Sequence, residues 1–299
     1  MDGAGAQALV LCQNGPMTRV RERLRPGDVV LLALLGMACA SAAARLPGHP
    51  ELRGPLLAHL ALLGGFGLLL GLALAGRLPW SGPLRVLASL GLVYVLYASL
   101  GRLGFLLHDG DADAALAALD ARLFGVDPAL WLDGRVGPAL VEAMSFVYLY
   151  YLGLVYLSLA LECLGREESD GEAFLLGLTL TYAVAYVGYL VVPAHGPAGH
   201  HAEQFAHALQ GGAIHETMRA TVEANGGAIG AFPSLHVGGA FFLCAFSLRR
   251  NRMRGLTYLP VVPLVALSTI VLRWHWVVDW IAGIAVACFF SALAQSFSR

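Results

Sequence analysis

Residues 256–297 read LTYLPVVPLVALSTIVLRWHWVVDWIAGIAVACFFSALAQSF, and most of them are apolar. Two long apolar runs, 256–273 and 275–297, meet at a short polar stretch around His275. A helix of about 20 apolar residues crosses the hydrocarbon core of a bilayer, and helices satisfy all their backbone hydrogen bonds within that core. The stretch therefore predicts two membrane-spanning helices joined by a tight polar turn.

The same pattern recurs along the rest of the chain. We predict eight membrane-spanning helices, at 28–46, 55–76, 84–107, 136–164, 173–193, 232–249, 256–273 and 275–297. The composition agrees, because 58% of the residues are hydrophobic, 13% are charged and the mean hydropathy is +0.68, whereas soluble domains carry about 25% charged residues. The expected fold class is all-α, a polytopic transmembrane helical bundle. The formal net charge of −1 gives no sign of a nucleic-acid partner.

The arginines predict how the chain is oriented in the membrane. Further arginines fall around 77–85, 165–172 and 249–255, and four precede the first span, namely Arg19, Arg21, Arg23 and Arg25. Because basic residues are enriched in cytoplasmic loops, we expect both termini in the cytoplasm and the long segments 108–135 and 194–231 outside it. The first run has some features of a cleaved signal peptide, but the even number of spans favours keeping it as a helix.

The two outer segments differ in character. Segment 108–135 opens with Asp109, Asp111 and Asp113 and continues as the amphipathic stretch LAALDARLFGVDP, which predicts a helix lying in the outer membrane interface. Segment 194–231 is rich in glycine and holds five histidines, His195, His200, His201, His207 and His215. Their spacing fits no common pattern of metal ligands, so we expect a solvated loop and no metal site.

Two histidine motifs carry the candidate chemistry. FPSLH at 232–236 opens the sixth predicted span and WHWVVD at 274–279 opens the eighth, so both lie at the outer face. His275 and Asp279 are four residues apart, so on a helix the carboxylate can accept the imidazole N–H and fix its tautomer. The other ring nitrogen of His275 can then attack phosphorus as a nucleophile, while His236 protonates the departing oxygen as a general acid.

The charge of a phosphate requires further hydrogen-bond donors. Pro233 suits the first turn of a helix, so the amides after it are available to hold an anion, and Ser234 can add a hydrogen bond. The candidate cations are Arg273, two residues before His275, and Arg102, near the outer end of the third predicted span. An arginine within a span is costly unless it has a partner, and Arg102 could instead pair with Glu142 to tie two helices together.

Other residues of these regions have simpler explanations. Either histidine alone could be structural, but the two motifs at one membrane face favour a joint site. The aromatic residues near that face favour interfacial anchors over a substrate cage; they are Tyr148, Tyr150, Tyr151, Trp274, Trp276 and Trp280. The glycines of the second predicted span favour close helix contacts; they are Gly64, Gly65, Gly67 and Gly71.

FPSLH and the later H-x-x-x-D resemble the second and third signature motifs of the phosphatidic acid phosphatase type 2 (PAP2) superfamily, whose enzymes work through a phosphohistidine. Ser268 and Thr269 before Arg273, together with LDARLFGVDP and VPAHGP (192–197), are more similar to the branch of inositol phosphorylceramide synthases and their bacterial relatives. The resemblance covers about residues 84–297. Thr269 stands where the superfamily usually has an arginine, and the superfamily's first motif is not visible.

The resemblance implies a six-helix catalytic core within a membrane domain at 84–299, preceded by a cytoplasmic segment at 1–27 and two accessory transmembrane helices at 28–83. It implies transfer of a phosphoryl or phospho-alcohol group, such as inositol phosphate, from a lipid phosphate or phospholipid to water or an alcohol. The implied site residues are His275, His236 and Asp279 for catalysis and Ser234, Arg273 and Arg102 for the phosphate, without a cofactor or metal.

Three alternatives remain open at this point. The residues do not decide between a hydrolase and a transferase. The missing basic residues also leave open a PAP2-fold lipid transporter or lipid-binding membrane protein with weak or no catalysis. We expect a multi-pass protein of the bacterial cytoplasmic (inner) membrane whose site faces the extracytoplasmic side.

Overall fold

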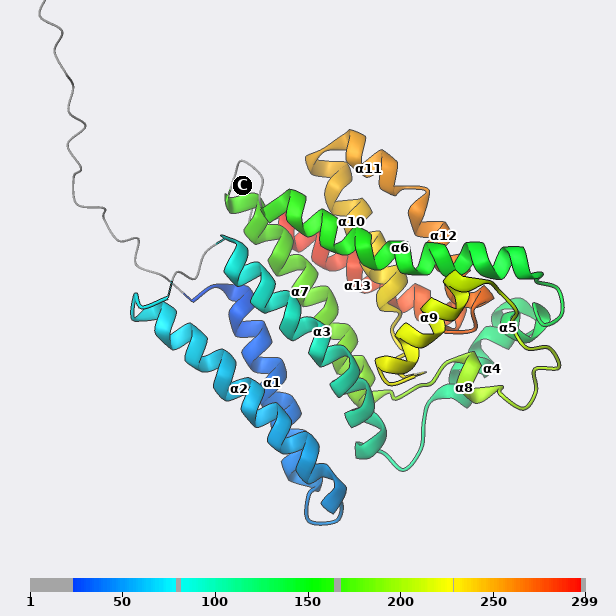
Figure 1. The fold of residues 1–299 in the computed structure, drawn as a ribbon, viewed down its shortest axis with the longest axis horizontal. Helices are drawn as coiled ribbons and strands as arrows, with labels where there is room; N and C mark the ends of the chain where they lie inside the picture. Colours follow the sequence, from blue (N-terminus) through cyan, green and yellow to red (C-terminus); the bar gives the residue numbers. More distant parts are fainter. Residues whose placement is uncertain (1–23, 79–81, 164–167, 228, 297–299) are drawn as a thin grey trace, which may run out of the picture.

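The computed structural model describes residues 24–78, 82–163, 168–227 and 229–296, and these residues form helices joined by loops (Figure 1). No strand occurs within these ranges, so the predicted all-α class is confirmed. Four arginines used above to predict orientation lie outside the described residues; they are Arg19, Arg21, Arg23 and Arg166.

Seven helical segments within the described ranges are long and apolar enough to cross a membrane. They are built from α1 (Pro26–Arg45), η1 (Pro50–Leu52) with α2 (Arg53–Leu74), α3 (Gly82–Leu107), α6 (Pro138–Cys163), α7 (Glu168–Val191), α11 (Arg252–Tyr258) with α12 (Val261–Val271), and α13 (Val277–Ser296). The predicted multi-pass membrane protein is confirmed, and α1 packs against α3 and α7 as part of the bundle.

The remaining predicted span is shorter than expected. It corresponds to α10 (Leu235–Arg250), which has 16 residues and is therefore about 24 Å long, less than the hydrocarbon core of about 30 Å. Residues 232–234 form the turn and cap that precede the helix, so α10 begins later than the predicted span 232–249. Most of α10 is buried among α6, α7, α12 and α13, so its length is set by the bundle around it.

The ends of the long helices fall into two groups. At one end, the starts of α1, α3 and α7 are joined because Arg25 and Arg85 both contact Glu172. Arg249 near the end of α10 donates to Gln295 near the end of α13, at 2.7 Å. The long segments 108–135 and 194–231 gather at the opposite end (Figure 1). The two predicted sides therefore correspond to two ends of the bundle.

Four shorter helices cover the end that holds the long segments. They are α4 (Asp113–Phe124), α5 (Pro128–Trp131), α8 (Pro197–His200) and α9 (Ala213–Ala224). The helix predicted within 108–135 is present as α4. Its exposed side carries Leu119, Leu123 and Phe124, which suits a helix lying in a membrane interface.

Glycines bring helices together at positions other than those predicted. Within the described part of the chain, no side chain or neighbouring backbone lies within 4 Å of a Cβ added at Gly64, Gly65, Gly67 or Gly71, so the predicted close contacts of that run are not found there. A Cβ on Gly238 of α10 would lie 2.8 Å from the carbonyl oxygen of Gly283 in α13. The close approach therefore joins the two helices that follow the histidine motifs.

Candidate active site

His275 and His236 are buried side by side. Nδ1 of His275 lies 2.8 Å from the carbonyl oxygen of Ala231 and 3.3 Å from Oδ2 of Asp279. A carbonyl oxygen only accepts hydrogen bonds, so Nδ1 carries the ring proton and Nε2 keeps a lone pair. That Nε2 lies 3.4 Å from Nδ1 of His236. The structure thus brings the three predicted catalytic residues together and adds Ala231 as a second partner.

Asp279 positions His275 from the first turn of α13. Its Oδ2 also accepts the backbone N–H of Trp276 at 2.8 Å, and its own N–H donates to the Trp276 carbonyl at 3.2 Å. His275 lies two residues before α13 and not on the helix as predicted. His275 still lies beside Asp279, because the two hydrogen bonds between Trp276 and Asp279 turn the residues before α13 back toward the Asp279 side chain.

The chain reaches His275 through a tight turn at the end of α12. The N–H of Arg273 donates to the Ile270 carbonyl at 2.9 Å and the N–H of Trp274 donates to the Thr269 carbonyl at 2.8 Å, the two bonds of a Schellman motif. Arg273 adopts the left-handed φ of 66° that glycine usually supplies there. This turn fixes the direction in which His275 leaves α12.

The side chain of Arg273 is held away from the histidine pair. Its Nη2 donates to Asp133 at 2.9 Å and to the His207 carbonyl at 3.0 Å, and its guanidinium lies 3.7 Å from the centre of the Phe205 ring. It lines neither of the cavities described below. These contacts show that Arg273 holds the outer loops together. Its predicted role in phosphate binding stays a prediction.

Ser234 caps α10. Its Oγ accepts the N–H of Val237 at 3.4 Å, its carbonyl accepts the N–H of Gly238 at 3.0 Å, and its own N–H donates to the Asp279 carbonyl at 3.1 Å. Pro233 precedes this cap, so the expectation that it lies in the first turn is wrong. The cap sets His236 at the second residue of the helix, and the predicted phosphate contact of Ser234 stays a prediction.

Two buried carboxylates of α4 hold the loops of the site. Asp120 accepts the N–H groups of Val277 and Val278 at 2.7 and 2.9 Å, at the start of α13. Burial raises the pKa of Asp120, although these two amides oppose the effect. Asp113 accepts from Trp276 Nε1 at 3.1 Å, next to His275. Helix α4 is therefore fastened to the segment that carries His275.

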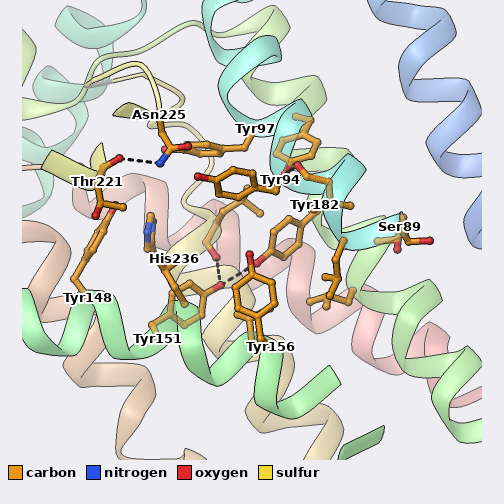
Figure 2. A pocket seen from close by; sticks show the side chains of 18 of the residues that line it. Ser89, Tyr94, Tyr97, Tyr148, Tyr151, Tyr156, Tyr182, Thr221, Asn225 and His236 are labelled. Atoms are coloured by element: carbon orange, nitrogen blue, oxygen red, sulfur yellow. Dashed lines mark hydrogen bonds between the residues drawn. The ribbon is translucent and has the colours of Figure 1, made fainter. Parts of the chain in front are cut away.

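A cavity of about 130 Å³ extends from His236 into the bundle. Tyrosines dominate its wall, and Figure 2 shows their rings gathered beside His236. Tyr148 stacks on His236 with ring centroids 4.3 Å apart, and the hydroxyl of Tyr151 donates to the Leu235 carbonyl at 3.0 Å. Both tyrosines are buried, so their predicted role as interfacial anchors is wrong.

A second, smaller cavity lies at the histidine pair. It has a volume of about 20 Å³ and is lined by both His236 and His275. Tyr97, Tyr148 and His236 line both cavities. A polar reaction centre therefore adjoins an apolar compartment.

Trp276 is also fully buried, so it is not the interfacial anchor predicted above.

Arg102 does not form the predicted ion pair. The carboxylate of Glu142 accepts the backbone N–H groups at the start of α9, namely those of Gly212, Ile214 and His215. Arg102 is exposed and lies beside Gly226, where an added Cβ would be 2.8 Å from its Nε. It lines neither cavity, so its predicted contact with the phosphate stays a prediction.

The histidine-rich loop is solvated in part, since His207 is 67% exposed, but other histidines of the loop are buried or make specific contacts. His195, His201 and His207 each lie within 3.5 Å of a carboxylate from segment 108–135, at Asp113, Asp127 and Asp133 respectively. His215 is buried and its Nδ1 lies 3.0 Å from Ser145 Oγ; burial lowers the pKa of His215. The two outer segments are therefore joined by a series of histidine contacts.

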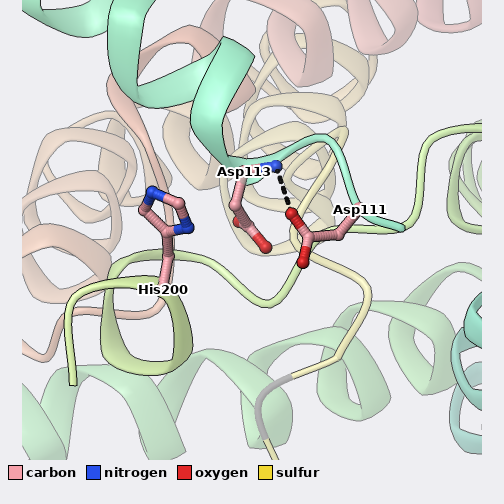
Figure 3. A group of neighbouring side chains, drawn as sticks. All are labelled: Asp111, Asp113 and His200. Carbon is pink, nitrogen blue, oxygen red and sulfur yellow. Dashed lines mark hydrogen bonds between the residues drawn. The ribbon is translucent and has the colours of Figure 1, made fainter. Parts of the chain in front are cut away.

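One group in this region has the spacing of metal ligands. Asp111, Asp113 and His200 place ligand atoms within 4.8 Å of one another (Figure 3). Oδ1 of Asp113 already accepts from Gly196 N and Trp276 Nε1, and Oδ2 accepts from His195 N and Nδ1. A metal ion would have to displace these bonds, so Asp113 is explained by its role in tying the loops together.

Sequence reasoning missed Asp113, Asp120 and the cavity tyrosines as parts of the site. The signal for the carboxylates was present, because Asp113, Leu116 and Asp120 share one face of α4 at the spacing of a helix. Tyr182 and Tyr186 on α7 are likewise one turn apart and line the cavity. Their shared helix face shows that they line a cavity only when the packing of α7 against α6 is known.

Comparisons with known proteins place these residues in a family. Residues 114–293, more than half of the chain, match the family model described as PAP2 superfamily. No curated protein gives a significant match, and no solved structure does. The matched segment runs from α4 to α13 and contains both histidine motifs. On this evidence the chain belongs to the PAP2 superfamily.

Proposed function

We propose that this membrane protein transfers a phosphoryl or phospho-alcohol group from a lipid through a phosphohistidine on His275. One observation carries the proposal: His275 keeps its proton on Nδ1, next to Ala231 and Asp279, and turns Nε2 toward His236 beside an apolar cavity. A nucleophile oriented by a third group and paired with an acid is the arrangement that covalent catalysis requires.

The reaction has two displacements. In the first, the Nε2 lone pair of His275 bonds to phosphorus, the bond from phosphorus to the ester oxygen breaks, and Nδ1–H of His236 gives that oxygen its proton. In the second, water or an alcohol attacks phosphorus, the P–N bond breaks, and His236 takes the proton of the attacking hydroxyl. Asp279 stabilises the positive charge that His275 acquires while it is phosphorylated.

The cavity supports a lipid as the substrate. It is mostly aromatic and aliphatic, and its lining includes His236 as well as Tyr94 of α3 and Tyr156 of α6, which are 52% and 48% exposed. A hydrocarbon chain lying in it would place the phosphate at the histidines and emerge between α3 and α6 into the bilayer. Burial of each CH₂ contributes about 0.8 kcal/mol, so a chain can supply much of the affinity.

The acceptor and the membrane side are further parts of the proposal. The similarity of LDARLFGVDP and VPAHGP to inositol phosphorylceramide synthases favours an alcohol such as inositol over water. The arginines at the end of α10 and the start of α11 favour a cytoplasmic position for that end of the bundle. The histidine pair would then face the extracytoplasmic side of a bacterial inner membrane.

A second candidate is a PAP2-fold protein that binds or moves lipids without turnover. The observation that favours it is the lining of the two cavities, which contains no arginine among the described residues. Catalysis at a phosphate usually relies on cationic or preorganised donors, and the chain has no lysine at all.

One experiment separates these candidates. Purified protein in detergent micelles is incubated with a radiolabelled lipid phosphate or phosphatidylinositol, with and without an alcohol acceptor, and His275→Ala is the matched control. Release of inorganic phosphate or inositol phosphate identifies a hydrolase, and a labelled alcohol product identifies a transferase. Binding without turnover in the wild type would replace our proposal by the lipid-binding one.

A further inference from the structure

The two cavities hold few groups that can neutralise a phosphate. Among the described residues that line them, only three histidines can carry a positive charge, namely His195, His236 and His275. His275 and His236 already serve as nucleophile and acid in the proposed reaction. His195 lines the small cavity together with them and has no role so far.

His195 is held in one orientation by several contacts. Its backbone N–H donates to Oδ2 of Asp113 at 2.7 Å, and its ring Nδ1 lies 3.2 Å from the same oxygen. A second carboxylate, Asp111, lies 3.6 Å from Nδ1. The ring packs on Phe105 with centroids 4.0 Å apart. These contacts fix the Nδ1 edge of the ring and leave Nε2 without a hydrogen-bond partner in the described part of the chain.

The same contacts tie His195 to the reaction centre. Asp113 also accepts from the indole of Trp276, the residue after His275. Ala194, the residue before His195, accepts the N–H of Ala231 at 3.0 Å, and the Ala231 carbonyl holds Nδ1 of His275 at 2.8 Å. Two independent paths therefore fix His195 relative to His275, so its place in the cavity does not depend on a mobile loop.

We infer that His195 is the phosphate-binding cation of this site and donates from Nε2 to a nonbridging phosphate oxygen. Nδ1 carries a proton because its neighbours are carboxylate oxygens. A donor at Nε2 is then available only in the doubly protonated, cationic ring, which pairs well with a phosphate. The carboxylates remain on the far edge of the ring and would stabilise that charge without facing the ligand. The inference rests on the proposed function.

The test measures phosphate affinity apart from turnover. Binding of inorganic phosphate is followed by titration calorimetry in micelles for the wild type, His195→Ala, His195→Gln and the matched control His207→Ala. His207 belongs to the same loop and also lies beside an aspartate, but it is 67% exposed and lines neither cavity. Loss of one charge-assisted hydrogen bond weakens binding by about 10- to 100-fold, which we expect for His195→Ala and not for His207→Ala.

A conservative variant separates binding from a structural role. Asp111 and Asp113 lie at Nδ1 of His195, and His236 and His275 share the cavity, so the wild type is compared directly with His195→Gln, which keeps a neutral donor but carries no charge. Phosphate should bind more weakly to the Gln variant than to the wild type. The unfolding temperature should be the same in both.

Two other outcomes would overturn the inference in distinguishable ways. Equal phosphate affinity in His195→Ala and His207→Ala, with normal turnover in both, would remove His195 from the site and leave the proposed function intact. A wild type that neither binds phosphate nor turns over a lipid phosphate would remove both proposals together. A raised KM for a short-chain lipid phosphate with little change in kcat in His195→Gln would support the assignment.

Discussion

At the scale of single residues, the two nitrogens of His275 have different surroundings, and this difference decides its chemistry. Nδ1 has two acceptors, of which Ala231 at 2.8 Å is closer than Asp279 at 3.3 Å. Nε2 has the ring of His236 opposite it. The backbone carbonyl alone is sufficient to keep the proton on Nδ1, so Asp279 acts mainly by stabilising the charge on the ring.

The first prediction concerns Asp279→Asn. Because Ala231 still fixes the tautomer, the variant should turn over about 10- to 100-fold more slowly, the usual effect of losing an outer partner of a functional histidine, while still forming the covalent intermediate. Turnover and phosphate labelling are measured together. Complete loss of labelling, as in His275→Ala, would show that the carboxylate is indispensable for the nucleophile.

At the scale of helices, the contact between α10 and α13 sets the distance between the two histidines. A Cβ on Gly283 would lie 2.4 Å from the carbonyl oxygen of Ser234, the residue that caps α10 two positions before His236. Close packing of two helix backbones at this point leaves no room for a methyl group. Gly283 therefore allows α10 and α13 to lie close together, and this spacing sets the positions of the two histidines.

The second prediction compares Gly283→Ala with Gly71→Ala. The former should lower stability by about 1–3 kcal/mol, the usual cost of overpacking, and should reduce turnover as α10 and α13 move apart. The latter lies in α2 with nothing within 4 Å of the new Cβ and should be neutral or slightly stabilising. Thermal unfolding in detergent checks both. Equal behaviour of the two variants would refute the close contact.

The tyrosine-lined cavity is a further property of the packed helices α3, α6 and α7. Leu178 of α7 lines it and is 5% exposed, whereas Leu157 on α6 is 52% exposed and lines neither cavity. A larger side chain at Leu178 would fill space that the substrate chain is proposed to occupy. The same change at Leu157 would face outward.

The third prediction follows from this difference. Leu178→Trp should raise KM for a long-chain lipid phosphate by about tenfold, corresponding to the lost burial of about two CH₂ groups, with little effect on a water-soluble phosphate ester. Leu157→Trp should change neither value. Steady-state kinetics with both substrates give the comparison, and an equal rise in KM for the two substrates in Leu178→Trp would place the chain elsewhere.

At the scale of the whole molecule, a buried ion network joins the first helices to the rest of the bundle. Arg85 at the start of α3 is 3% exposed, and its Nε lies 3.2 Å from Oδ1 of Asp28 in α1, which is fully buried. Arg85 also contacts Glu172 of α7. Helix α1 therefore contributes a charge partner and apolar packing to the segment 84–299.

The fourth prediction is that Arg85→Ala destabilises the protein by about 3–5 kcal/mol, because the buried carboxylate of Asp28 loses the guanidinium that lies 3.2 Å from it. Asp28→Asn in the same chain should restore part of the loss. Arg249→Ala is the matched control at the same end of the bundle, where the guanidinium is exposed and pairs with Gln295. Equally small changes in unfolding for Arg85→Ala and Arg249→Ala would rule the network out as a stabilising feature.

Much of this architecture could be predicted from the sequence because apolar runs and arginines report membrane spans directly. Both histidine motifs could be predicted for the same reason, since they begin predicted spans at one face. The Ala231 carbonyl, the Asp113 contacts and the outward position of Gly71 could not. Each depends on which helix faces pack against one another. In addition, every residue has a backbone carbonyl group, so the sequence does not indicate which carbonyl forms a hydrogen bond. The length of α10 was overestimated because Phe232 and Pro233, which precede its cap, are apolar.

The most direct test of the account is to trap phosphate on His275. The wild type, His275→Ala, His236→Ala and Asp279→Asn are mixed with a lipid phosphate labelled at phosphorus, quenched rapidly and assayed for protein-bound phosphate that is labile in acid and stable in base. We expect labelling in the wild type and in Asp279→Asn and none in His275→Ala. His236→Ala should label only from a substrate such as p-nitrophenyl phosphate, whose leaving group departs without a proton. Labelling that persists in His275→Ala, or turnover without labelling in the wild type, would contradict the account.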